Sequence, residues 1–243
     1  AFVFSPILRS RLQNLTVRGG VDVQNNSTDL LGSSFSNDRI RSLRAGAQYD
    51  VTDSAGGINQ ADIQISQGIK AFGATDNGTG RTRINGEQAY TKVNAEVART
   101  QALPYNLSIY AGAAGQLSAD PLLTGEQFVL GGARYGSAYD PGELSGDNGL
   151  AGRAELRYGD SVGATYLDAY QLYTFYDAGK VWLKKPLASE KESQSLTSAG
   201  VGARVNFTPV ISGSVEAAVP LTKEVTAEGD KDARIFSNLT ARF

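Results

Sequence analysis

The chain of 243 residues contains no cysteine, no histidine and no methionine. Without cysteine it can have neither a disulfide framework nor thiolate chemistry. Without histidine, the Ser-His-Asp and Cys-His arrangements of hydrolytic enzymes cannot form, and neither can the common zinc sites. We therefore expect a protein that is not an enzyme, with no catalytic residues, no metal and no cofactor. Carboxylate-based catalysis is the one enzymatic route that the composition leaves open.

Long apolar runs and clusters of positive charge are also missing. No segment approaches the roughly 18 apolar residues that a membrane-spanning helix needs. The formal net charge is −2, and no cluster of lysine and arginine stands out, so we expect no nucleic-acid partner. The sequence begins without a charged-then-apolar signal segment, which indicates a mature protein or a piece of a longer one.

Alternation of apolar and polar residues with a period of two runs through most of the chain. In the sharpest case, Val93, Ala95 and Val97 alternate with Lys92, Asn94 and Glu96. Comparable segments are 15–24, 43–51, 62–66, 107–117, 199–207, 211–221 and 235–243. We count about eleven such strands, most of them longer than the ~5–6 residues typical of soluble sheets. Short connections (101–105, 208–209) coexist with long polar ones (72–87, 184–193), as in outer-membrane barrels.

A soluble β-sandwich or a lipocalin-like barrel would also show alternating strands. Such a fold would bury large apolar side chains, whereas one face of the predicted strands is repeatedly charged and the other is apolar but small. The charged positions are Arg44, Asp50, Lys92, Glu96, Arg204 and Glu216. Strand length and loop asymmetry favour the membrane alternative. We therefore expect an all-β fold, a transmembrane antiparallel β-barrel of the bacterial outer membrane.

One segment, 130–149, does not alternate and contains six glycines and one proline. Its composition predicts a long, glycine-bent loop. A mobile external loop is one interpretation, but Tyr135 and Tyr139 favour a loop that folds against another part of the protein.

Here the chain resembles the two-partner secretion transporters of the haemolysin secretion/activation type, within the outer-membrane insertase superfamily. The frame Phe-x-Leu-Gly-Gly, a glycine/tyrosine core and then Gly-Glu-x-Ser-Gly-Asp-x-Gly resembles the sixth-loop motif of that family. The matching residues are Phe128, Leu130, Gly131, Gly132, Tyr139, Gly142, Glu143, Ser145, Gly146, Asp147 and Gly149. A second match lies at 175–182, where Phe175, Asp177 and Gly179 resemble the family's Phe-x-Asp-x-Gly strand, and a third lies at 5–14.

The resemblance implies that this loop folds back into the barrel lumen, where a loop arginine pairs with the aspartate of the Phe-x-Asp motif. Asp177 is present, but Ser137 stands where the family has arginine. Either Arg134 takes over the pairing, or a weaker hydroxyl–carboxylate bond does, or the residue was altered. With a serine at 137, we expect a loop held less firmly than in relatives, near the strand that carries Asp177.

The resemblance also bears on the ends of the chain. Alternation in the last segment ends on an aromatic residue, so Leu239, Ala241 and Phe243 resemble the signal that the barrel-insertion machinery reads. About five predicted strands follow the loop and about six precede it, whereas the family has about eleven before it. Residues 1–243 are therefore expected to be the C-terminal two-thirds of a sixteen-stranded barrel. The first strands and the periplasmic polypeptide-binding repeats are expected to lie outside them.

The function implied is a translocation pore that exports an unfolded partner exoprotein, adhesin-like or haemolysin-like. The expected partners are this client polypeptide, outer-membrane lipid and, during biogenesis, the barrel-insertion machinery. An insertase for other barrels and a passive porin are the alternatives. A barrel enzyme would have to use carboxylates such as Asp140, Glu143 and Asp147, but acids flanked by glycine are more often turn formers. The sequence identifies neither the client nor the oligomeric state.

Overall fold

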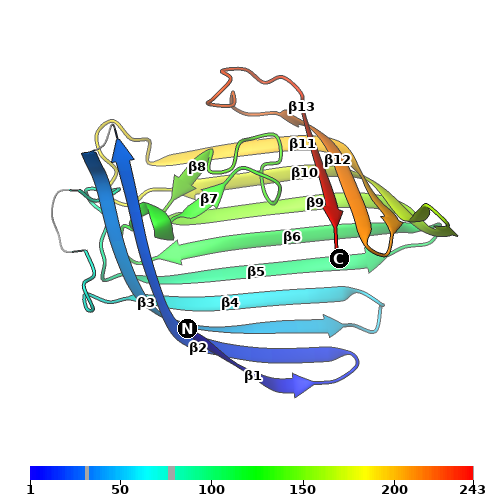
Figure 1. Ribbon diagram of the computed structural model, residues 1–243, viewed down its shortest axis with the longest axis horizontal. Coiled ribbons are helices and arrows are strands. Elements are labelled where there is room, and N and C mark those ends of the chain that lie inside the picture. Colours follow the sequence, from blue (N-terminus) through cyan, green and yellow to red (C-terminus); the bar gives the residue numbers. More distant parts are fainter. Residues whose placement is uncertain (31–32, 76–79, 243) are drawn as a thin grey trace.

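The computed structural model describes residues 1–30, 33–75 and 80–242. Eleven antiparallel strands form one sheet in which each strand pairs with its neighbours in chain order (Figure 1). The strands are β1 (Phe2–Arg9), β2 (Gln13–Leu30), β3 (Ser33–Thr52), β4 (Ile58–Gly68), β5 (Thr91–Ala102), β6 (Leu107–Ser118), β9 (Asn148–Ala164), β10 (Leu167–Trp182), β11 (Ser193–Thr208), β12 (Ile211–Pro220) and β13 (Arg234–Ala241). Six strands precede the glycine-rich segment and five follow it, which confirms the expected count.

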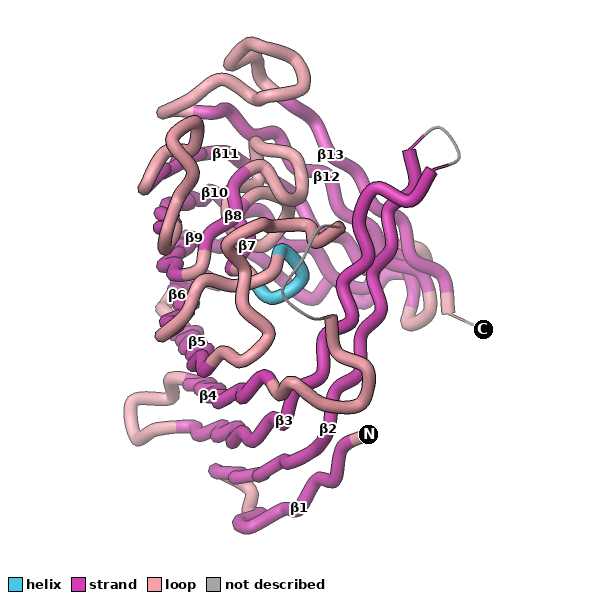
Figure 2. Tube along the Cα trace, turned by 90° about the vertical axis from the view of Figure 1, so that its left-hand side faces the viewer, coloured by secondary structure: helices cyan, strands magenta, loops and turns pink. Residues whose placement is uncertain are grey.

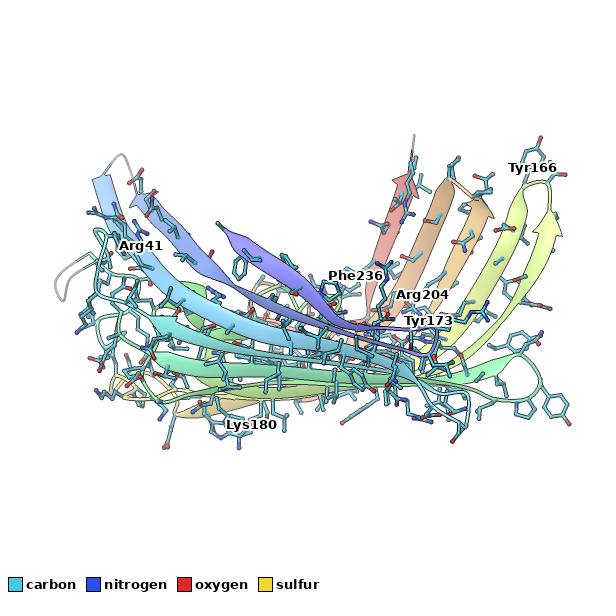
Figure 3. All side chains as sticks on the ribbon, turned by 90° about the horizontal axis from the view of Figure 1, so that it is seen from below. Arg41, Tyr166, Tyr173, Lys180, Arg204 and Phe236 are labelled. Atoms are coloured by element: carbon cyan, nitrogen blue, oxygen red, sulfur yellow. The ribbon has the colours of Figure 1, made fainter. Side chains whose placement is uncertain are left out.

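The sheet is curled, and its two faces differ in chemistry. Side chains on the convex face are apolar and exposed; for example Val97 is 55%, Val201 58% and Val215 52% exposed. Side chains on the concave face are polar, and Figure 3 shows Arg204 and Tyr173 on that side while Lys180 points away on the other. An apolar outer face around a polar interior is typical of a barrel wall in lipid and opposite to a soluble sandwich.

The two ends of the sheet differ as well. At one end the connections are tight, over residues 10–12, 53–57, 103–106, 165–166 and 209–210. At the other end the connections 69–90, 119–147, 183–192 and 221–233 are long. Tight periplasmic turns and long external loops are the usual arrangement in outer-membrane barrels. Among the described residues, no helix is both long and apolar enough to cross a membrane.

Residues 119–147, hereafter the inner loop, lie within the curve of the sheet (Figure 2). They carry the short helix η1 (Thr124–Glu126) and a small hairpin of β7 (Phe128–Leu130) and β8 (Leu144–Gly146). The largest buried apolar cluster forms where this loop packs on the concave wall. Its members include Leu130, Tyr135, Tyr139 and Leu144 of the loop and Tyr173, Phe175, Val181 and Leu196 of the wall. The loop thus supplies much of the core that fills the interior.

At the C-terminal edge, β13 pairs with β12 from Ala218↔Arg234 to Ile211↔Ala241. Leu239 is 72% exposed, and Ala241 lies two residues on, so both occupy the convex face. Phe243, the last residue of the predicted targeting signal, lies outside the described residues.

Candidate functional site

Glycines bring the inner loop against the wall. Gly131 and Gly132 follow β7 with φ of +105° and +86°, a region that residues with a Cβ rarely adopt. Gly179 of β10 leaves room for Leu130, because a Cβ there would lie 2.8 Å from Leu130 Cδ1. Gly146 of β8 approaches the wall as closely, because a Cβ added at this glycine would lie 2.8 Å from Val181 Cβ. The glycines of both sequence motifs therefore allow close contact between loop and wall.

Asp177 is fully buried and is the point at which the inner loop is tied to β10. Its Oδ2 accepts hydrogen bonds from the backbone N–H groups of Gly136 at 3.3 Å and Ser137 at 3.0 Å. The hydroxyl of Ser198 on β11 donates to the same oxygen at 3.2 Å. The loop therefore contacts this carboxylate directly through its backbone.

The guanidinium beside Asp177 comes from Arg153 on β9, not from the loop. Its Nη1 lies 3.2 Å from Asp177 Oδ2 and donates to the Ser137 hydroxyl at 2.6 Å. Arg153 is directly opposite Asp177 in the ladder between β9 and β10. Ser137 thus stands at the position to which the family resemblance assigns an arginine. Its hydroxyl accepts a hydrogen bond from Arg153 of the wall.

Two further carboxylates surround Arg153. Its Nε donates to Glu155 at 2.5 Å and its Nη2 to Glu216 of β12 at 3.0 Å, while the guanidinium lies over the Phe175 ring at 3.9 Å. Glu155 also accepts from Arg157 and Arg204, and Tyr173 donates to Glu216. Three arginines therefore meet three carboxylates in one buried network, an arrangement that satisfies most of their hydrogen-bonding groups.

Arg134, the expected substitute for the loop arginine, lies elsewhere. It forms an ion pair with Glu96 on β5, and its side chain is 67% exposed. The nearby Tyr135 is buried, and burial, followed by the charge of Glu96, raises the pKa of Tyr135 to about 12. Arg134 therefore ties the loop to β5, and within the described residues its ionic partner is Glu96 and not Asp177.

The far end of the inner loop meets the connection between β12 and β13. Tyr139 is fully buried, and its hydroxyl lies 3.2 Å from the carbonyl oxygens of Thr197 and Lys223. Glu143 binds Lys223 and both the backbone N–H and the hydroxyl of Thr226. Burial raises the pKa of Glu143, but the hydrogen bonds from Lys223 and Thr226 outweigh it, so that this pKa is lowered overall.

Asp147, at the end of the loop motif, forms a second buried centre. It is fully buried and accepts two hydrogen bonds from Arg83 Nη1, at 2.6 and 2.8 Å. It also accepts from the backbone N–H groups of Leu122 and Lys184, each at 2.6–2.7 Å. Arg83 belongs to connection 69–90, so this one ion pair joins three of the long connections. Asp147 lies beside the end of β10, at Lys184, and not beside Asp177.

Glu126 in η1 anchors the start of the inner loop. Its carboxylate is 1% exposed and lies 2.7 Å from Arg44 on β3 and 2.8 Å from Lys92 on β5. Lys92 also donates to the Glu126 carbonyl oxygen at 2.7 Å. Together with Arg153 and Glu143, this contact fastens the loop on both sides of the concave face.

Sequence reasoning missed Arg153, Arg83 and Glu126. For Arg153 a signal was present, since a tight turn at 165–166 between two alternating strands places residue 153 close to opposite residue 177. Arg83 and Glu126 lie in segments without alternation, where no register can be inferred. Asp140 and Ser145 are less informative: Asp140 pairs with Arg234 at 2.7 Å, and Ser145 lies in the β7–β8 ladder. The described part of the chain contains no cluster of three or more residues suited to a metal.

A polar concave face, an apolar convex face and a folded inner loop are features of the wall of an outer-membrane β-barrel. The family model for the haemolysin secretion/activation protein ShlB/FhaC/HecB matches residues 5–205, so the chain belongs to this two-partner secretion family. The family is one of secretion transporters located in the outer membrane and is not an enzyme family. No curated protein matches the chain significantly.

Solved structures show the same fold. CdiB from Escherichia coli superimposes with a TM-score of 0.77 at 19% identity, over 100% of this chain and 44% of that one. CdiB from Acinetobacter baumannii gives 0.72 at 16% identity, over 99% and 41%. BamA from Haemophilus ducreyi lacking POTRA domains 1–3 gives 0.65 at 11% identity, over 99% and 53%. The chain thus spans less than half the length of either CdiB structure.

Proposed function

We propose that residues 1–243 form the C-terminal two-thirds of the barrel of a translocation pore, which exports an unfolded partner exoprotein of the adhesin or haemolysin type. The remaining strands and the periplasmic polypeptide-binding repeats would precede these residues in the complete protein. The protein has no catalytic role in this proposal, and its partners are the exported polypeptide, the surrounding lipid and, during biogenesis, the insertion machinery.

The observation that carries the proposal is the inner loop, seated across the polar concave face by ionic contacts. A passive pore needs a fixed lining, and an internal segment that spans the interior would obstruct it. A pore wide enough for an extended polypeptide needs a closed resting state, because otherwise small solutes would leak through it. Ion pairs suit such a closure, since they hold the loop firmly in one position yet can be exchanged for contacts with water and client.

Secretion of the partner provides the test. The full-length protein would be expressed together with a candidate exoprotein, chosen as a large secreted protein from the same genome, and this partner would be measured in the medium and in the periplasm. We expect the partner in the medium only when the transporter is present. A transporter variant with a stop codon before β13, which lacks the last strand of the barrel, is the negative control for secretion.

Two other outcomes would replace the proposal. Reduced levels of many outer-membrane barrels after deletion of the gene, with no secreted partner, would identify an insertase. Uptake of small solutes that does not depend on any partner would identify a passive porin.

A further inference from the structure

A cavity of about 640 Å³ lies between the inner loop and the concave faces of β6 and β9 to β13. Its lining includes Arg153, Arg157, Arg204 and Arg134 as well as Glu155 and Glu216. Pockets of roughly 300–1,000 Å³ hold drug-sized ligands, so this one has room for a short stretch of extended polypeptide. Figure 3 shows Arg204, Tyr173 and Phe236 gathered on this inner side of the sheet.

Arginine side chains stacked on aromatic rings form much of the cavity surface. The Arg204 guanidinium lies 3.8 Å from the centroid of the Tyr173 ring, and the Arg157 guanidinium lies 4.4 Å from that of Tyr110. Stacking holds both guanidiniums flat against the wall. Arg204 already donates through Nη1 and Nη2 to Glu155 and through Nη1 to Gln171, whereas Arg157 donates to Glu155 through Nε. Among the described residues the two Nη groups of Arg157 have no hydrogen-bond partner, so this arginine is preorganised to receive an acceptor from the cavity.

The charges around the cavity are unequally exposed. Arg204 and Arg134 are 39% and 67% exposed, whereas Glu155 and Glu216 are 2% and 15% exposed. The carboxylates thus lie beneath the arginines and hold them in place. A molecule in the cavity therefore meets the more exposed Arg204 and Arg134 and aromatic faces, with Glu155 and Glu216 deeper in the lining, and the network as a whole is nearly balanced in charge.

The position of the cavity also matters. Arg157 pairs in the ladder with Ser108, next to the tight turn 103–106, and Arg204 pairs with Gln171 on the same half of the sheet. Tight turns face the periplasm in outer-membrane barrels. The cavity is therefore on the side from which an exported polypeptide arrives, and the inner loop lies beyond it.

We propose that this arginine–aromatic cavity is a docking site for acidic, extended segments of the exported polypeptide. The inference rests on the proposed function and adds to it the chemistry of the segment that binds first. Aspartate and glutamate side chains accept a bidentate hydrogen bond from the two Nη groups of Arg157, the stacked Arg204 adds positive charge beside it, and aromatic rings accommodate the intervening backbone. Each contact is exposed to water and hence weak, which lets the chain bind and move on.

The test uses the full-length protein, purified in detergent micelles, and three fluorescein-labelled peptides of equal length. The peptides are repeats of Glu-Ser, Gln-Ser and Lys-Ser, and binding is followed by fluorescence anisotropy at low ionic strength. We expect the Glu-Ser peptide to bind most tightly. The double variant Arg157→Gln/Arg204→Gln should weaken that binding by at least about tenfold, as the loss of charge-assisted hydrogen bonds implies.

Arg18→Gln is the matched control, because Arg18 lies on the same concave face but pairs with Asp62 outside the cavity. It should leave the affinity for the Glu-Ser peptide unchanged. Equal binding of the three peptides to the unaltered protein would overturn the proposal without any variant. A preference for Glu-Ser that survives in the double variant would also overturn it. Secretion of the partner in either case would leave the proposed export function intact.

Discussion

At the scale of single residues, Arg153 accounts for the serine at position 137. The wall arginine already supplies the guanidinium that Asp177 requires, and it is held by Glu155 and Glu216 as well. A side chain as small as serine leaves space for it, and the loop adds backbone N–H groups in place of a charged side chain. The contact between loop and wall therefore includes a buried charge pair even though the loop contributes no charge to it.

Asp177→Asn is expected to loosen the inner loop strongly. The substitution removes the buried charge that faces Arg153, and it offers one acceptor oxygen and an NH2 donor where the carboxylate accepts from Arg153, Ser198 and two backbone N–H groups. Breaking a buried pair typically costs about 3–5 kcal/mol, which corresponds to at least ~100-fold faster opening. The opening of the inner loop is measured by hydrogen exchange of the amides of residues 130–147. Asp62→Asn, which breaks a half-exposed pair with Arg18 on the same face, should leave those amides nearly unchanged.

Ser137→Arg should also weaken the attachment, contrary to what the sequence alone suggested. The hydroxyl of Ser137 is 2.6 Å from Arg153 Nη1 in a site with almost no exposure, so a second guanidinium would meet the first. Combining Ser137→Arg with Arg153→Ser moves the single guanidinium from the wall to the loop and should restore slow exchange. If the single substitution slows exchange by itself, Arg153 is not the partner of Asp177 in solution.

Glu143 makes the attachment of the β12–β13 connection dependent on pH. Because the pKa of Glu143 is lowered in the folded protein, its contribution is complete above the ordinary value of 4.5 and is lost as the pH falls through the lowered value. After correction for the intrinsic pH dependence of exchange, the amides of residues 221–233 should therefore be protected at neutral pH and lose protection below about pH 4.5. In Glu143→Gln this acid-dependent step should be absent. An identical pH profile in that variant would assign the effect to another group.

At the scale of elements, the alternating strands could be predicted, and their order and number follow from the tight turns. Their lengths could not: β2 runs to Leu30 and β3 starts at Ser33, well beyond the alternation at 15–24 and 43–51. The added residues are polar on both faces, such as Asn25 and Asn26, because they extend beyond the lipid-facing apolar band. The ionic contacts of the inner loop were equally hidden, since Glu126 and Arg83 meet partners that are remote in sequence.

Arg83→Gln is expected to release two long connections together. Arg83 binds Asp147 through both carboxylate oxygens and also reaches the Lys184 carbonyl oxygen, so its loss leaves a buried carboxylate without its cation. Hydrogen exchange should increase by about tenfold or more around both 80–90 and 144–149. The exposed pair Lys185–Glu87 nearby provides the control, and Lys185→Gln should change little. Faster exchange in 80–90 alone would show that Asp147 is held by its backbone donors.

At the scale of the whole molecule, the sheet separates two environments. Neighbouring residues on one strand face opposite sides, as Ser214 lines the inner cavity while Val215 is 52% exposed on the convex face. The same holds for Asn238 and Leu239 on β13. These adjacent pairs therefore offer matched positions from which to ask where a client polypeptide passes.

The most direct measurement is site-specific photo-crosslinking in the full-length protein during export of a partner that is stalled by a folded C-terminal fusion. A photoreactive residue would be placed at Ser214 or Asn238 on the concave face, and at Val215 or Leu239 as matched outward positions. We expect crosslinks to the stalled partner from the two inward positions and crosslinks to lipid alone from the two outward ones. Partner crosslinks from the outward positions, or none from the inward positions while export proceeds, would contradict passage of the polypeptide along the concave face.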